Sequence, residues 1–176
     1  MNVCIFCSAN DNIDRVYFEK AAQLAQHLAK AGHNIVFGGC NSGLMECVAK
    51  AAEEAGAMTI GVVPTIVERG SRVSEHVGVK ILCDNLSDRK QLMIDKSDAF
   101  IALPGGIGTL DEIFTVAASA TIGYHAKPLI AYNIDGFWDG LAAMLDGLQA
   151  KGMVRGRWTD HLEMANSIEE IDNLLA

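Results

Sequence analysis

A glycine-rich turn followed by two carboxylates is the strongest chemical signal in the sequence. It reads Pro104-Gly105-Gly106-Ile107-Gly108-Thr109-Leu110-Asp111-Glu112 and follows a short apolar run. Glycines let the backbone approach a ligand closely, and the unpaired amides at a helix start favour an anion. The spacing is neither that of a Walker loop nor the Gly-x-Gly-x-x-Gly of dinucleotide sites. The segment therefore predicts a phosphate site and disfavours nucleoside triphosphates and NAD.

Glu112 has two competing interpretations. The pattern Thr109-x-x-Glu112 fits a capping box at a helix start, and spacing alone favours that structural role. However, Asp111 and Glu112 beside an anion loop would weaken phosphate binding unless one of them faces another part of the ligand. A part that becomes positively charged during a reaction is one such partner, so a catalytic role is the alternative.

A second cluster of charges, Ser87-Asp88-Arg89-Lys90, opens a predicted helix. Adjacent cations near a helix N-terminus oppose the helix dipole at a cost of about 0.3 kcal/mol or more each, which is unusual for a purely structural turn. A functional role and a solvated face paired with Asp88 or Asp95 have equal weight on this evidence.

Other kinds of active site find little support. Cys4 and Cys7 have Cys-x-x-Cys spacing, but on an extended strand their side chains point to opposite faces, so one metal or disulfide could hardly use both. The five histidines show no paired metal-ligand spacing, and no Gly-x-Ser-x-Gly nucleophile elbow is present. We therefore expect no metal and no Ser-His-Asp hydrolysis.

Composition predicts one globular domain spanning residues 1–176. Half of the 176 residues are hydrophobic and 20% are charged, and a chain of this size buries roughly 70% of its unfolded surface without staples. Five cysteines, an odd number, and no leader-like start suggest reduced thiols and the cytoplasm. No apolar run approaches the ~18 residues of a membrane span, and a net charge of -8 disfavours nucleic acid.

Short apolar runs alternate with helical periodicity along the whole chain. Expected strands cover residues 3–7, 35–37, 59–63, 79–82, 99–103 and 129–132, with a short last one. Expected helices start near Asp14, Leu44, Asp88, Thr109 and Phe137, with a last one closing at Leu175, and residues 65–78 are expected to form a loop. Strict alternation predicts an α/β fold with a mostly parallel sheet covered on both faces. The glycine loops at 38–43 and 105–108 should then share one rim of the sheet.

Taken together, these residues resemble the LONELY GUY (LOG) family of cytokinin riboside 5′-monophosphate phosphoribohydrolases, long labelled "lysine decarboxylase-like". Its signature Pro-Gly-Gly-x-Gly-Thr-x-x-Glu is complete here, and its Arg-Lys pair appears as Arg89-Lys90. Residues 4–8 resemble its first strand, residues 38–45 its early glycine loop and Gly-Leu-Met, and residues 123–128 its Leu-Gly-x-His-x-Lys-Pro stretch. The resemblance runs from about residue 3 to residue 145.

The resemblance implies a Rossmann-like three-layer fold, a homodimer, and hydrolysis of the N-glycosidic bond of a nucleoside monophosphate without cofactor. The catalytic pair would be Arg89 and Glu112. Implied substrate-binding residues are Ser8, Gly39, Met45, Lys90, Gly105, Gly106, Gly108, Thr109 and Asp111. The glycine loop would hold the 5′-phosphate with help from Lys90, and the Glu112 carboxylate would stabilise an oxocarbenium-like transition state. Asp111 is a hypothetical proton donor to the leaving base. The apolar residues Ile113, Phe114 and 116–122 could be either core or subunit contact.

The sequence departs from the family pattern at several positions. Where the family commonly has Met-His before the Arg motif, this chain has Leu86-Ser87, and where the family has Trp-x-Gln, residues 119–121 are Ser-Ala-Thr. Cys40 replaces the third glycine of the early loop, and Ser8-Ala9 replaces the family's Gly-Ser. We expect these positions to line or flank the base pocket, so AMP or another purine monophosphate is the safer substrate class. A non-catalytic nucleotide or molybdenum-cofactor carrier is the alternative, because related Rossmann-like proteins have that role. Lysine decarboxylation ranks last, since no context for a Schiff-base lysine is recognisable.

Overall fold

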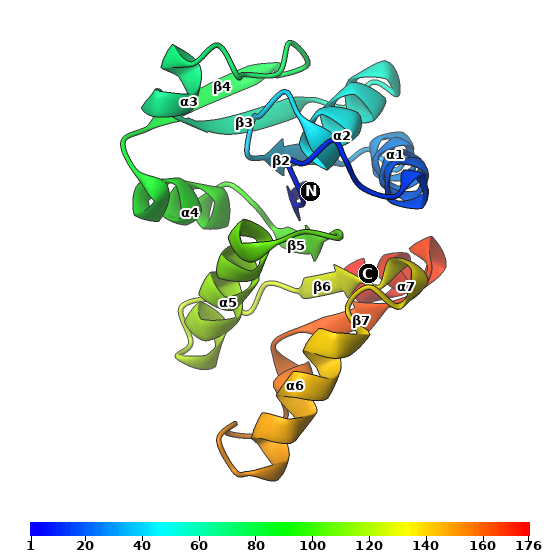
Figure 1. Ribbon diagram of the computed structural model, residues 1–176, viewed down its shortest axis with the longest axis vertical. Coiled ribbons are helices and arrows are strands. Elements are labelled where there is room, and N and C mark those ends of the chain that lie inside the picture. The colour runs from blue at the N-terminus through cyan, green and yellow to red at the C-terminus, as the bar shows by residue number, and fades with distance from the viewer.

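Seven parallel strands form one sheet at the centre of the molecule (Figure 1). The computed structural model describes residues 1–176, and the strand order is β4-β3-β2-β1-β5-β6-β7. The strands are β1 (Asn2–Phe6), β2 (Asn34–Phe37), β3 (Thr59–Pro64), β4 (Val79–Cys83), β5 (Ala99–Ala102), β6 (Leu129–Tyr132) and β7 (Glu163–Ala165). All six neighbouring pairs are parallel, so the expected α/β fold is confirmed, with a sheet that is wholly rather than mostly parallel.

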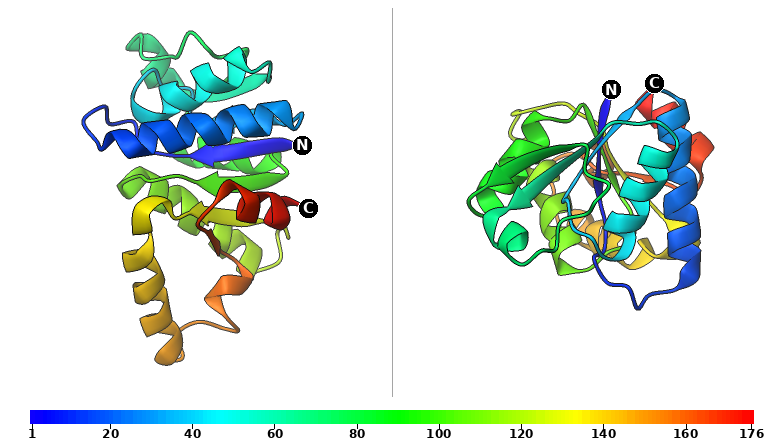
Figure 2. Two further views of the ribbon diagram at one scale, coloured as in Figure 1. Left: turned by 90° about the vertical axis from the view of Figure 1, so that its right-hand side faces the viewer. Right: turned by 90° about the horizontal axis from the view of Figure 1, so that it is seen from above.

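Helices cover both faces of this sheet. The helices are α1 (Arg15–Lys30), α2 (Gly43–Glu54), α3 (Thr65–Arg69), α4 (Leu86–Asp95), α5 (Ile107–Thr121), α6 (Asp139–Ala150) and α7 (Ile168–Leu175). One apolar cluster joins α1, α2 and α7 to the sheet, and a second joins α4, α5 and α6 to its other face. In the left view of Figure 2, α1, α2 and α7 lie in front of the sheet. The result is the three-layer, Rossmann-like arrangement.

The central strands are apolar on both sides because both faces are covered. Along β1, Val3 and Ile5 belong to the first cluster, whereas Cys4 and Phe6 belong to the second. Cys7, just beyond the strand, packs in the first cluster, so Cys4 and Cys7 do lie on opposite faces. All five cysteines are free thiols.

Helix boundaries agree with the sequence where a side chain or a glycine marks them. Asp14 caps α1 by accepting a hydrogen bond from the Val16 amide at 3.0 Å, and Gly32 follows its end with a positive φ of 82°. The expected start of α4 at Asp88 is wrong by two residues, because Asn85 caps the helix through the amides of Ser87 and Asp88. The expected loop at 65–78 begins with the short helix α3, and no further helix or strand follows before β4.

No helix in the structure combines the length and the apolar character needed to cross a lipid bilayer.

Candidate active site

The direction in which strands are added to the sheet reverses between β1 and β5. Strands β1 to β4 extend the sheet one way, whereas β5 to β7 extend it the other way. The loops after β1 and β5 are tied by a hydrogen bond from the Ser8 amide to the Pro104 carbonyl at 3.1 Å. Ligands of open parallel sheets bind outside the carboxyl ends of the strands at such a point.

A cavity of about 310 Å³ lies at this point. Its lining residues are Cys7, Ser8, Ala9, Asn10, Met45, Arg89, Gly106, Gly108, Thr109 and Glu112. The structure thus brings the two expected catalytic residues together with Ser8, Met45 and most of the glycine turn. Gly39, Lys90, Gly105 and Asp111 lie outside the lining. Cys7 and Asn10 were missed, although their place directly after the first strand becomes a clear signal once the strand order is known.

The glycine turn delivers an uncapped helix end to the cavity. Helix α5 begins at Ile107, its N-cap is Gly106, and no side chain makes a capping hydrogen bond. The capping box expected for Thr109 and Glu112 is therefore wrong, because Thr109 already lies inside the first turn. Free amides at a helix start attract an anion through hydrogen bonds and the helix dipole. The helix end is available to a phosphate group.

Gly105 leaves space for a side chain of this turn. A Cβ at Gly105 would overlap the Oγ1 atom of Thr109, so the glycine is needed for the Thr109 side chain to fold back over the turn. Thr109 is buried, yet it lines the cavity. Gly105 therefore shapes the site without being part of its surface.

Glu112 is a buried carboxylate that faces the cavity. Its exposed fraction is 6%, and neither carboxylate oxygen takes part in a hydrogen bond of the structure. Its nearest cation is Arg89, with Nη1 3.7 Å from Oε1. Burial raises the pKa of Glu112 from 4.5 to about 7; Arg89 opposes this rise, Asp111 adds to it, and Lys90 opposes it. The carboxyl can therefore exchange a proton near neutral pH.

Arg89 reaches the cavity from α4 across the early glycine loop. Its Nε donates to the carbonyl of Val62 at 3.2 Å. A Cβ at Gly38 would overlap the Nη2 atom of Arg89 and lie 3.0 Å from the sulfur of Met45. Gly38 is therefore required for the guanidinium to pass, a role that the sequence did not reveal.

The end of the early glycine loop, residues 38–43, is bonded to the segment that follows β1. The amide of Gly43, at the start of α2, donates to the Asp11 carboxylate at 2.7 Å, and the Leu44 amide donates to the Ser8 carbonyl at 2.9 Å. Both glycine loops do share the rim, as expected, because they follow parallel strands β2 and β5. In the early loop the amides of Gly43 and Leu44 are thus already bonded, whereas at the second loop no side chain caps the start of α5.

Lys90 and Asp111 form an ion pair beside the cavity. The Nζ atom of Lys90 lies 2.8 Å and 2.9 Å from the two carboxylate oxygens of Asp111. The lysine is 21% exposed and the aspartate 52% exposed. Both charged groups are thus engaged with each other.

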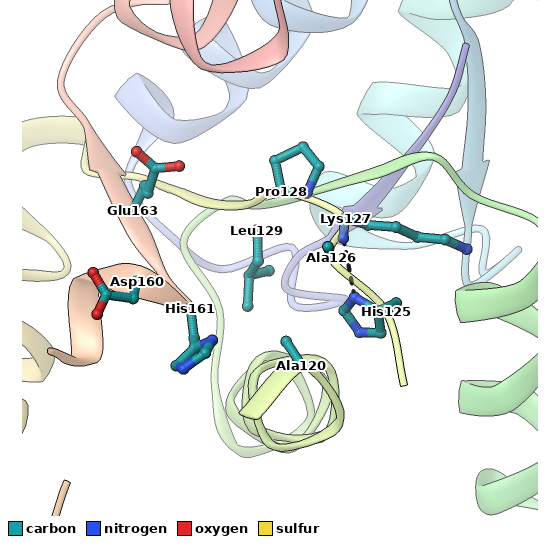
Figure 3. Close-up of a pocket in the computed structure, with 9 residues that line it drawn as sticks. All are labelled: Ala120, His125, Ala126, Lys127, Pro128, Leu129, Asp160, His161 and Glu163. Atoms are coloured by element: carbon teal, nitrogen blue, oxygen red, sulfur yellow. Dashed lines mark hydrogen bonds between the residues drawn. The ribbon is translucent and has the colours of Figure 1, made fainter. Parts of the chain in front are cut away.

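A second cavity, of about 300 Å³, lies at the opposite edge of the sheet, beside the first residues of β6 and β7 (Figure 3). Figure 3 shows His125 and His161 on either side of Ala120 of α5. The Nδ1 atom of His125 accepts from the Lys127 amide at 3.2 Å, and the Lys127 amine donates to the Ile94 carbonyl at 2.7 Å. Burial lowers the pKa of His125. These contacts indicate a structural role for this region.

Comparison with known proteins identifies the family. Residues 45–175 match the family described as "Possible lysine decarboxylase". The cytokinin riboside 5′-monophosphate phosphoribohydrolase of Mycobacterium tuberculosis is 34% identical over 168 residues, which cover 96% of this chain and 89% of the relative. The probable enzyme of that name, LOGL9, from Oryza sativa subsp. japonica is 40% identical over 152 residues, covering 86% and 67%. The chain belongs to the LOG family.

Solved structures of similar shape include molybdenum-cofactor proteins. The molybdenum cofactor binding protein of Rippkaea orientalis has a TM-score of 0.74 at 22% identity, and covers 99% of this chain and 94% of its own. A Moco carrier protein of Chlamydomonas reinhardtii has a TM-score of 0.71 at 21% identity, covering 99% and 96%. At such identities the likeness shows the fold alone.

The departures from the LOG pattern fall into two groups. Ser8 and Ala9 line the cavity of this LOG protein, as expected. Cys40, residues 86–87 and residues 119–121 do not line it within the single chain.

Proposed function

We propose that this LOG protein hydrolyses the N-glycosidic bond of a nucleoside 5′-monophosphate, of the purine or cytokinin type, such as AMP. The products are the free base and ribose 5-phosphate. One observation carries the proposal: Glu112, a buried carboxylate without a hydrogen bond, faces the same cavity as the uncapped start of α5. An anion site next to a carboxylate suits a ligand with a phosphate at one end and a sugar carbon that becomes positively charged during the reaction.

The proposed binding mode places the 5′-phosphate against the amides of Gly106, Gly108 and Thr109. The ribose then extends toward Glu112, and the base lies by Met45 and Asn10, which line the rest of the cavity. Arg89 contributes a positive charge between the phosphate and the sugar, where a guanidinium can donate to two oxygens at once.

The proposed reaction breaks the bond between C1′ of the ribose and the nitrogen of the base. The bonding electrons leave with the base, C1′ becomes electron-poor, and ionised Glu112 stabilises this charge. A water oxygen then bonds to C1′, and one water proton ends on the departing base. Because the pKa of Glu112 is about 7, its carboxylate can accept this proton from water and release it again.

Glu112 is the only carboxylate that lines the cavity, and this limits which group can supply the proton to the departing base. Inverting glycosidases use two carboxyl groups, one for water and one for the leaving group. Asp111, the hypothetical donor, has both oxygens on the Lys90 amine. We therefore propose Glu112 as the group that handles the proton, and the Asp111→Asn variant tests the alternative.

The test is release of base from a panel of nucleoside monophosphates, followed by chromatography. Arg89→Ala and Glu112→Gln are expected to lose at least a hundredfold in kcat/KM, whereas Arg15→Ala, a change at an exposed position of α1, keeps the wild-type value. Full activity in both site variants would remove the assignment. Tight binding of a monophosphate without any turnover would instead favour the carrier function.

We also propose that the protein is a cytoplasmic homodimer. Ile107 and Phe114 lie on one side of α5, and Ile122 directly follows the helix; they are 87%, 39% and 67% exposed, whereas Ile113 and Val116 are core residues. An exposed apolar patch is typical of an interface. Ultracentrifugation of Ile122→Asp should show monomers where the wild type shows dimers. Free cysteines throughout agree with a reducing compartment.

A further inference from the structure

We infer that the Lys90–Asp111 ion pair is a positioning device that sets the spacing of Arg89 and Glu112. Arg89 and Lys90 are consecutive residues of α4, and they pair with the consecutive residues Asp111 and Glu112 of α5. Lys90 and Asp111 form the outer pair, and Arg89 and Glu112 form the inner pair. The outer pair is tight, with Nζ–Oδ distances of 2.8 Å and 2.9 Å, while the inner pair is loose at 3.7 Å. The inference rests on the proposed function, because it concerns the same two catalytic residues.

Helix α4 needs such a device because little apolar packing holds it. Its buried side chains are Met93 and Ile94, both in its C-terminal part, and residues 86–91 bury none. Burial of apolar surface is the main force that docks a helix. The end of α4 that carries Arg89 therefore depends on polar contacts.

Three polar contacts hold α4 in place. Arg89 donates to the carbonyl of Val62 on β3, and Lys90 binds Asp111 on α5. At the other end, the amine of Lys127 donates to the Ile94 carbonyl. Apart from the loose Arg89–Glu112 pair itself, the Lys90–Asp111 pair is the ion pair that joins α4 to the helix that carries Glu112.

A loose inner pair is useful for catalysis. If Arg89 and Glu112 closed into a direct hydrogen-bonded pair, the carboxylate would be neutralised and unavailable to water or ribose. With α4 tethered by the outer pair, the guanidinium stops short of the carboxylate and leaves room between them. The outer pair lies partly in solvent, so it contributes little to overall stability and its effect is local.

The outer pair also balances the charge near Glu112. The groups coupled electrostatically to this carboxyl are Arg89 and Lys90 from α4, Asp111 from α5, the thiol of Cys4 on β1 and that of Cys7 just after this strand. Asp111 raises the pKa of Glu112 and Lys90 lowers it. Removing one member of the pair should therefore move the pH dependence in a direction that identifies that member.

Two other roles are compatible with the sequence. Lys90 could bind the phosphate, or Asp111 could protonate the base. Neither Lys90 nor Asp111 lines the cavity. The Lys90 amine donates to both carboxylate oxygens of Asp111, so both charged groups are already engaged.

The experiment compares Lys90→Met, Asp111→Asn, the double variant and Lys90→Arg with Lys96→Met. Lys96 is exposed at the end of the same helix and its side chain makes no hydrogen bond or ion pair, so it is the matched control. Measurements are kcat, KM and their pH dependence, the affinity for ribose 5-phosphate by calorimetry, and amide hydrogen exchange.

If the pair positions α4, each single variant should lower kcat at least tenfold and keep the ribose 5-phosphate affinity within threefold. The double variant should be no worse than either single one, because the pair acts as a unit. Lys90→Arg should recover most of the loss. The pH midpoint of kcat/KM should rise in Lys90→Met and fall in Asp111→Asn. Amides of residues 86–91 should exchange faster in both single variants but not in Lys96→Met.

Other outcomes overturn the inference. A tenfold weaker affinity for ribose 5-phosphate in Lys90→Met with unchanged kcat would make Lys90 a phosphate ligand. Loss of the alkaline limb of the pH profile in Asp111→Asn alone would make Asp111 the proton donor. Unchanged amide hydrogen exchange at residues 86–91 in Lys90→Met and Asp111→Asn would refute the positioning role of the ion pair. This result would hold even if the wild type hydrolysed no monophosphate. That absence of turnover would refute the proposed function separately.

Discussion

Replacing Glu112 with glutamine should abolish activity and yet stabilise the fold at alkaline pH. Glutamine has the shape of a protonated glutamate, so the substitution preserves packing and removes only the ability to ionise. In the wild type, the carboxyl is buried and has no hydrogen bond, so ionising it in the folded state is unfavourable. The variant avoids this cost.

The size of the effect follows from the pKa of Glu112, which is about 7 in the folded protein against 4.5 for an ordinary glutamate. Between these values the folded state holds a proton that the unfolded state has released, so stability falls as the pH rises through this window. At about 1.4 kcal/mol for each pH unit, the wild type loses about 3 kcal/mol by pH 8. Glu112→Gln should therefore be about 3 kcal/mol more stable at pH 8 and equal to the wild type near pH 4.5.

Urea unfolding at pH 5 and pH 8 measures this difference directly, and thermal unfolding at pH 8 should show a gain of roughly 6 to 12 °C for a domain of this size. Glu75→Gln, at an exposed position, is the matched control and should change stability by less than about 0.5 kcal/mol at both pH values. A Glu112→Gln variant that is less stable at pH 8, or whose gain does not depend on pH, would refute the idea that an unfavourably buried charge sits in this cavity.

Four further predictions concern residues of the same site. The kcat/KM for a monophosphate should rise with pH up to about 7, because the ionised form of Glu112 is the active one; a profile flat between pH 5 and pH 8 would contradict this. Gly38→Ala should lower kcat/KM at least tenfold, since the new Cβ overlaps the Arg89 guanidinium, and an unchanged value would show that the guanidinium works from another position. Gly108→Ala should stabilise the protein by about 0.5 kcal/mol or more in urea unfolding, because helical glycine is entropically costly and no atom lies within 4 Å of the new Cβ. The larger Gly108→Val should raise KM by narrowing the cavity, and an unchanged KM would move the substrate elsewhere.

Much of the fold could be predicted from the sequence because burial on both faces leaves a direct trace. Strands such as β5 are short, wholly apolar runs, and each is followed by a helix with apolar residues on one side. Alternation then implies parallel strands and right-handed crossovers. Helix starts were less accurate, since α4 begins at Leu86 and α5 at Ile107, each two residues before the position that the sequence suggested.

The residue types at the site were also readable from the sequence, because glycine turns and paired charges have few purely structural uses. The chain itself determined that Arg89 and Glu112 stood in segments able to serve an anionic ligand. Only the tertiary structure decided that they face one cavity, that Gly38 makes room for the guanidinium, and that Lys90 binds Asp111. Those relations join residues from separate strands and helices, and they depend on the strand order of the sheet. Strand order is a property of long-range packing, which local patterns of residues do not encode.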